Sequence, residues 1–144
     1  MILVLDVGNS QIFCGVFDQG ELSMQFRYAS TSRSSSDEIG VFLRGALREN
    51  GVAPEAIETI GISSVVPELN YTLWACCQKY FDIDPMVLRP GLKTGLQIGY
   101  KDPKEVGSDR IADAMGAVKL FPDRNLIVVD ADLVADSGPN LKVT

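Results

Sequence analysis

The residues with the clearest potential for chemistry follow the first apolar run of the chain. Residues 2–5 are apolar, and Asp6, Gly8, Asn9 and Ser10 come directly after them. A strand that ends at a sheet edge places its last side chains where α/β proteins bind ligands. Gly8 allows a sharp turn, and the backbone N–H groups after it, with the Ser10 hydroxyl, could bind an anion. Asp6 would then need Mg²⁺ between its carboxylate and bound phosphates.

An ordinary hairpin is the alternative for the same residues. Glycine and asparagine are frequent in turns because they tolerate backbone conformations that other residues avoid. Short motifs also match by chance. The first ten residues alone therefore do not decide between a phosphate loop and a simple turn.

A second polar block lies at the expected start of a helix over residues 107–121. Gly107 and Ser108 precede Asp109 and Arg110. A carboxylate in the first turn of a helix is kept ionised by the helix dipole, so Asp109 could orient a substrate hydroxyl for phosphoryl transfer. Arg110 could pair with an anionic substrate. The alternative is that Ser108 or Asp109 is only an N-cap.

Composition excludes several classes of site and partner. The chain has 144 residues, no histidine and a net charge of −6, with 13 scattered basic residues. These features exclude Ser-His catalysis and His-ligated zinc, and they argue against nucleic acid or membrane partners. The three cysteines (Cys14, Cys76 and Cys77) are expected to be reduced core residues. The absence of a signal peptide predicts a cytoplasmic protein.

The hydrophobic pattern predicts a mixed α/β fold. Strands are expected over residues 2–5, 11–18, 21–29, 59–67, 86–89 and 125–130, and helices over 36–50, 67–81 and 107–121. Gln19-Gly20 is expected to form a hairpin turn, Ser36 or Asp37 to cap the first helix, and residues 90–100 to be irregular. An antiparallel meander of three strands followed by helix–strand alternation indicates a mixed sheet.

Taken together, these motifs resemble the type III pantothenate kinases. DVGNS at residues 6–10, SSVVP at 63–67, KTGL at 93–96 and the block from Tyr100 to Arg110 occur in that family's order. The family belongs to the superfamily of actin, sugar kinases and heat-shock chaperone ATPases, so the resemblance implies a ribonuclease H-like lobe over residues 1–124. Residues 125–144 would begin a second lobe of a two-lobe kinase.

The resemblance also implies a function and its residues. The reaction would be ATP-dependent phosphorylation of pantothenate to 4′-phosphopantothenate, the first step of coenzyme A biosynthesis, in a cytoplasmic homodimer with Mg²⁺ and a monovalent cation (K⁺ or NH₄⁺). Asp109 would be the catalytic base, Asp6 would lie near Mg²⁺, and Asp130 would bind the monovalent cation. The pantothenate site would contain Tyr100, Gly107, Ser108, Asp109 and Arg110. The ATP phosphates would contact Asp6, Val7, Gly8, Asn9, Ser10, Gln11, Ile12 and Phe13.

The resemblance ends shortly after Asp130. The family continues with Asp-Phe-Gly-Thr-Ala-Thr-Thr, whereas this chain reads Asp-Ala-Asp-Leu-Val, so that Leu133 replaces an ATP-binding threonine. Two further hypotheses follow: a truncated form of such a kinase, or a non-catalytic regulatory homologue that keeps part of the phosphate or pantothenate binding. A general sugar kinase or chaperone-like ATPase is a further alternative, against which Tyr100 and the Gly-Ser-Asp-Arg block argue.

Overall fold

The computed structural model describes residues 1–89, 92–99, 101–102 and 105–129. The chain divides into two compact units, Met1–Leu88 and Arg89–Thr144. The first unit holds every strand of the described residues, and the second holds one long helix. The boundary predicted from the family resemblance, between residues 124 and 125, stays a prediction.

The first unit begins with an antiparallel meander of β1 (Ile2–Val7), β2 (Gln11–Asp18) and β3 (Glu21–Ala29). Buried side chains alternate with more exposed ones along β1 and β2, which is the pattern of strands with one buried face. The turn between β2 and β3 has positive φ at both Gln19 (49°) and Gly20 (88°), the geometry that two-residue hairpins favour. The predicted hairpin at these residues is confirmed.

Two parallel strands complete the sheet. β4 (Thr59–Ser64) pairs with β1, and β5 (Met86–Leu88) pairs with β4, so that the order is β3-β2-β1-β4-β5. The connections run through α1 (Ser36–Glu49) and α2 (Asn70–Phe81). A three-strand meander extended by parallel strands with helical crossovers is the predicted ribonuclease H-like mixed sheet, and the fold class is confirmed.

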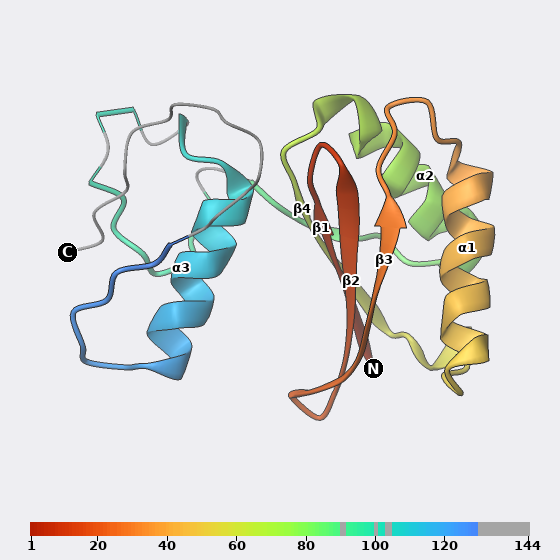
Figure 1. Ribbon diagram of the computed structural model, residues 1–144, viewed down its shortest axis with the longest axis horizontal. Helices are drawn as coiled ribbons and strands as arrows, with labels where there is room; N and C mark the ends of the chain where they lie inside the picture. Colours follow the sequence, from red (N-terminus) through yellow and green to blue (C-terminus); the bar gives the residue numbers. More distant parts are fainter. Residues whose placement is uncertain (90–91, 100, 103–104, 130–144) are drawn as a thin grey trace. The chain divides into compact units, whose positions relative to one another are not determined.

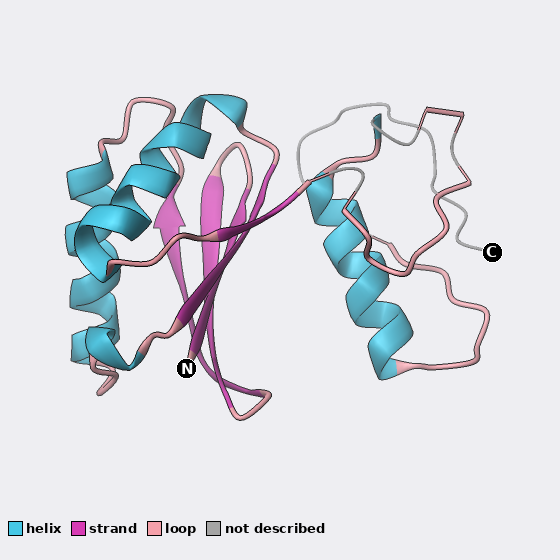
Figure 2. Cartoon of the chain, turned by 180° about the vertical axis from the view of Figure 1, so that it is seen from behind, coloured by secondary structure: helices cyan, strands magenta, loops and turns pink. Residues whose placement is uncertain are grey.

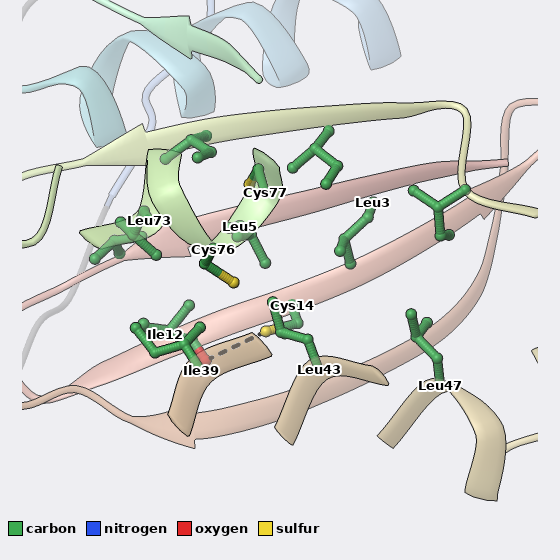
Figure 3. Close-up of a cluster of buried hydrophobic side chains, with 14 of the residues drawn as sticks. Leu3, Leu5, Ile12, Cys14, Ile39, Leu43, Leu47, Leu73, Cys76 and Cys77 are labelled. Carbon is green, nitrogen blue, oxygen red and sulfur yellow. Dashed lines mark hydrogen bonds between the residues drawn. The ribbon is translucent and has the colours of Figure 1, made fainter. Parts of the chain in front are cut away.

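Both helices cover the same face of the sheet (Figures 1 and 2). The core lies between them and the sheet, and Figure 3 shows the side chains that meet there. Its largest members are at most 1% exposed. Within residues 1–88 no helix covers the other face of the sheet. The fully buried core side chains are Leu3, Leu5, Val7, Ile12, Val16, Ile39, Leu43, Leu47, Ile60, Leu69 and Leu73, joined by the sulfur-containing Cys14, Cys76 and Cys77.

The start of α1 corrects one expectation. The N-cap is Ser35, not Ser36 or Asp37. The Ser35 hydroxyl accepts a hydrogen bond from the Glu38 N–H (3.1 Å), and Glu38 Oε2 accepts one from the Ser35 N–H (2.7 Å). This reciprocal pair is a capping box, which needs a glutamate three residues after the cap. The hydrogen bonds from the Ser35 backbone and side chain lower the pKa of Glu38.

Helix α1 packs closely on α2 through a glycine. A methyl group added to Gly40 would lie 2.2 Å from Cδ2 of the Tyr80 ring. Beside this contact, Asp37 accepts hydrogen bonds from Lys79 Nζ (2.7 Å) and the Tyr80 hydroxyl (2.9 Å). Before α2, Pro67 opens the short 3₁₀ helix η2 (Pro67–Leu69), a first helical turn where proline is tolerated.

The second unit contains α3 (Ser108–Leu120), as predicted for residues 107–121. The strand expected over residues 125–130 is not formed by residues 125–129, which have no regular structure. Ile127 and Val129 are 94% and 79% exposed. A strand needs a neighbour to pair its backbone groups, and the described residues of the second unit contain no strand that could pair with this segment, so the prediction of a strand here is wrong for residues 125–129. None of the helices in the described part of the chain is long and apolar enough to be a membrane span.

Candidate functional site

The Asp6–Ser10 motif is the turn between β1 and β2. The Gly8 N–H donates to the Gln11 carbonyl oxygen (3.0 Å), and the Ser30 N–H donates to that of Ser10 (2.9 Å). The turn is a hairpin, a geometry compatible with both hypotheses, and the phosphate-binding role of these residues stays a prediction. Asn9 and Ser10 do not have the positive φ angles of the Gln19-Gly20 turn. Because the Gly8 N–H is used within the turn, an anion would be bound by the N–H groups that follow it.

The sheet register places the Asp6 side chain in a row that crosses all five strands. Asp6 is level with Phe13 on β2 and Ser63 on β4, and the row continues to Arg27 on β3 and Leu88 on β5. Directly paired residues project from the same face of a sheet. This face is opposite the one covered by α1 and α2, because Leu5 and Val7, the neighbours of Asp6, are buried in the core.

Two of the eight predicted ATP-contacting residues, Val7 and Ile12, belong to that core. Each is only 1% exposed. Any contact of these two residues with a nucleotide would therefore come from the backbone, while their side chains fix the turn to the helices beneath. Asp6, Asn9, Ser10, Gln11 and Phe13, by contrast, are exposed.

Phe13 carries a cation on its ring. The guanidinium carbon of Arg27 lies 4.2 Å from the ring centroid, within the range of a cation–π contact, which contributes about 0.5–1 kcal/mol at an exposed site. A β-bulge between Val16 and Phe17 sets the register that brings these two side chains together. Arg27 was not among the predicted site residues, because only the strand register, and no local sequence signal, brings it beside Phe13.

The second predicted block begins α3, with Gly107 as the N-cap and no side chain capping the helix. The proposed alternative, in which Ser108 or Asp109 is the N-cap, is wrong. Asp109 lies in the first turn, where its Oδ1 accepts a hydrogen bond from the Arg110 N–H (2.8 Å). It is half-buried, whereas Arg110 is exposed. The carboxylate thus lies at the positive end of the helix dipole, as expected.

The structure describes the two predicted halves of the site in separate units. Asp6–Phe13 belongs to Met1–Leu88, and Gly107–Arg110 belongs to Arg89–Thr144. Tyr100, Asp130 and Leu133 lie outside the described residues. The roles of all these residues stay predictions.

A magnesium site formed by protein side chains alone is absent from the described residues. No group of three or more His, Cys, Asp or Glu side chains gathers there. Mg²⁺ in phosphoryl-transfer enzymes is commonly held by one or two carboxylates together with substrate phosphates. A single exposed carboxylate such as that of Asp6 fits that second kind of site, in which the ion arrives with the nucleotide.

Comparison with known proteins identifies the family. The family model described as "Type III pantothenate kinase" matches residues 2–132. The chain belongs to the type III pantothenate kinase family. A relative of that name from Legionella pneumophila is 54% identical over 130 residues, and one from Elusimicrobium minutum is 49% identical over 130 residues.

Each of these alignments covers 90% of this chain and 50% of the relative. The chain thus spans about half the length of the curated family members that it matches. Among solved structures, YeaZ from Pseudomonas aeruginosa aligns with 65% of this chain and 46% of its own, at 15% identity and a TM-score of 0.44, a likeness too slight to bear on function.

Proposed function

We propose that this chain provides the phosphate-binding and hydroxyl-orienting residues of an ATP-dependent pantothenate kinase that makes 4′-phosphopantothenate. One observation carries the proposal: the family match over residues 2–132 runs through both halves of the predicted site, Asp6–Phe13 and Gly107–Arg110. The exposed side chains of Asp6 and Phe13 and the helix-start position of Asp109 are compatible with those roles.

In the proposed reaction the residues have distinct tasks. The pantothenate hydroxyl oxygen bonds to the γ-phosphorus while the bond from that phosphorus to the β–γ bridging oxygen breaks, and ADP leaves. The hydroxyl proton passes to the Asp109 carboxylate, which also aims the hydroxyl. Arg110 pairs with the substrate carboxylate. Asp6 would hold Mg²⁺, which neutralises phosphate charge when bound, and Asp130 a monovalent cation.

The direct test is an assay of the whole chain with ATP, Mg²⁺, K⁺ and pantothenate, in which phosphopantothenate is detected by mass spectrometry. The Asp109→Asn variant is expected to lower the rate roughly 10²–10⁴-fold, the usual contribution of a positioned acid or base. Asp123→Asn is the matched control because Asp123 is exposed in the turn after α3, with a φ of 58° that asparagine tolerates.

Two outcomes separate the alternatives. Binding of ATP or pantothenate without turnover would support the non-catalytic homologue that retains part of the site. Neither binding nor turnover would refute the kinase proposal for this chain. The family resemblance extends the proposal to a cytoplasmic homodimer, which analytical ultracentrifugation would test.

A further inference from the structure

Arg27 is an arginine whose guanidinium is held in place by an aromatic ring. Its guanidinium stacks on Phe13, and it forms no ion pair with any described residue. The side chain is exposed on the sheet face that α1 and α2 leave uncovered. An unpaired arginine on a protein surface is ordinary, but one whose plane is held by an aromatic ring has already lost part of its rotamer freedom.

The position of Arg27 in the sheet places its cation near Asp6 and the β1–β2 turn. It occupies the same cross-strand row as Asp6, with only Phe13 between them. Neighbouring strands lie about 4.8 Å apart, so the Cα atoms of Arg27 and Asp6 are separated by roughly 10 Å. The β1–β2 turn begins two residues after Asp6, at the end of β1. The residue after β3 is held to that turn by a hydrogen bond from the Ser30 N–H to the Ser10 carbonyl oxygen.

We infer that Arg27 is a phosphate-binding residue of the ATP site, held ready by Phe13. The inference rests on the proposed function. A polyphosphate at the β1–β2 turn, with Mg²⁺ on the Asp6 side, leaves anionic oxygens on the β3 side that need a cation. The guanidinium offers a planar fork of N–H donors that matches phosphate oxygens in pairs. Phe13 thereby acts as a positioning residue for Arg27.

The experiment compares nucleotide and substrate affinities of the full chain by isothermal titration calorimetry, with Mg-ATP, tripolyphosphate and pantothenate as separate ligands. Arg27→Ala should weaken Mg-ATP and tripolyphosphate binding roughly 10- to 100-fold, the effect of losing a charge-assisted contact. Pantothenate affinity should stay within twofold. Arg27→Lys, which keeps the charge and loses the fork, should recover only part of the loss.

Arg48→Ala is the matched control, because Arg48 is an exposed arginine in the last turn of α1, on the covered side of the sheet. Arg48→Ala should bind all three ligands like the wild type. Phe13→Leu should weaken ATP binding less than Arg27→Ala, while circular dichroism shows an unchanged fold.

The outcomes distinguish this inference from the proposed function. If Arg27→Ala and Arg48→Ala both bind Mg-ATP as tightly as the wild type does, the role of Arg27 is overturned while the proposed function stands. Equal losses for ATP and pantothenate in Arg27→Ala would also overturn it, because they indicate a general structural defect. Failure of the wild type to bind ATP would overturn both.

Discussion

Gly40 is the residue on which the packing of α1 against α2 depends most directly. Gly40→Ala places a methyl group 2.2 Å from Cδ2 and 2.4 Å from Cγ of Tyr80, and Cγ is close to the backbone, so the ring cannot simply swing away. Overpacking costs about 1–3 kcal/mol, which outweighs the helix-propensity gain of about 1 kcal/mol. We expect a net loss of up to roughly 2 kcal/mol in the free energy of unfolding.

Gly45 provides the control in the same helix, because a methyl group there meets nothing within 4 Å. Gly45→Ala should stabilise the protein by about 0.5–1 kcal/mol. Urea unfolding followed by circular dichroism measures both variants. If the urea midpoints of Gly40→Ala and Gly45→Ala shift in the same direction, the contact with Tyr80 does not limit the size of the side chain at position 40.

The cysteines are inert core residues, as the sequence predicted. Cys14, Cys76 and Cys77 are buried, and burial raises the pKa of each thiol to about 12. Because the thiolate is the reactive form, the native protein should react with a disulfide reagent at pH 8 many times more slowly than the unfolded protein. Absorbance should count three thiols in guanidinium; rapid labelling without denaturant would contradict the buried placement.

At the scale of elements, Asp37 links the start of α1 to the end of α2. The hydrogen bond from Lys79, and to a smaller extent the one from Tyr80, lowers the pKa of Asp37 below its usual 3.8. A depressed pKa means that the charged form stabilises the fold above pH 3.8, and that this contribution is lost as pH falls through the lower native value. Lys79 shows the reciprocal effect, since hydrogen bonding to Asp37 raises its pKa above 10.5.

Asp37→Asn should therefore lower the urea midpoint by a constant amount from pH 7 to about pH 4, and the difference from the wild type should shrink below pH 3.8. Both partners are exposed, so the effect should be small and should weaken in high salt. Lys79→Met removes the partner of Asp37, so it should reduce the fall of the urea midpoint that the wild type shows below about pH 4. A difference between wild type and Asp37→Asn that persists unchanged at pH 2 would exclude the ionised carboxylate as its cause.

Elements were predicted well where a local pattern decided them. The meander, its Gln19-Gly20 turn and the three helices follow from apolar spacing and turn chemistry. The N-cap was misplaced by one residue, because three consecutive serines compete and Glu38 selects Ser35 through the capping box. The strand expected over 125–130 failed because an apolar run becomes a strand only when a neighbour pairs with it.

The candidate site depended on information that a local pattern lacks. Counting back from the Gln19-Gly20 turn would pair Phe13 with Phe26. The bulge between Val16 and Phe17 shifts the register by one residue, so Arg27 joins Phe13 while Phe26 turns to the core beside Phe42. A shift of one residue exchanges the two faces of a strand. The Phe13–Arg27 pair was therefore not visible in sequence.

At the scale of the whole molecule, the large hydrophobic cluster of the described residues belongs to residues 1–88, while the second unit buries the apolar side chains of Val106, Ile111 and Ala114. The central strands β1 and β4 are paired on both sides and carry fully buried side chains. Hydrogen exchange read by mass spectrometry should accordingly be slowest in peptides from β1 and β4, since amides of core strands open only with global unfolding. Residues 125–129 should exchange within seconds.

Peptides from α1 serve as an internal reference of intermediate protection, because that helix has one face in the core and one in solvent. Protection of residues 125–129 comparable to that of β1 would mean that this segment is paired as a strand, which would restore the expectation drawn from its apolar pattern.

The Gln19-Gly20 turn has a practical consequence for following this protein in solution. It closes the β2–β3 hairpin at the opposite end of the sheet from the Asn9-Ser10 turn (Figure 1). Its residues are exposed, and nothing lies within 4 Å of the Gly20 Cβ position. Exposed tips of this kind accept inserted segments with little cost. A fluorophore attachment tag inserted there would lie on the hairpin whose strands carry Phe13 and Arg27, and it would test the proposed nucleotide binding without blocking the Asn9-Ser10 turn.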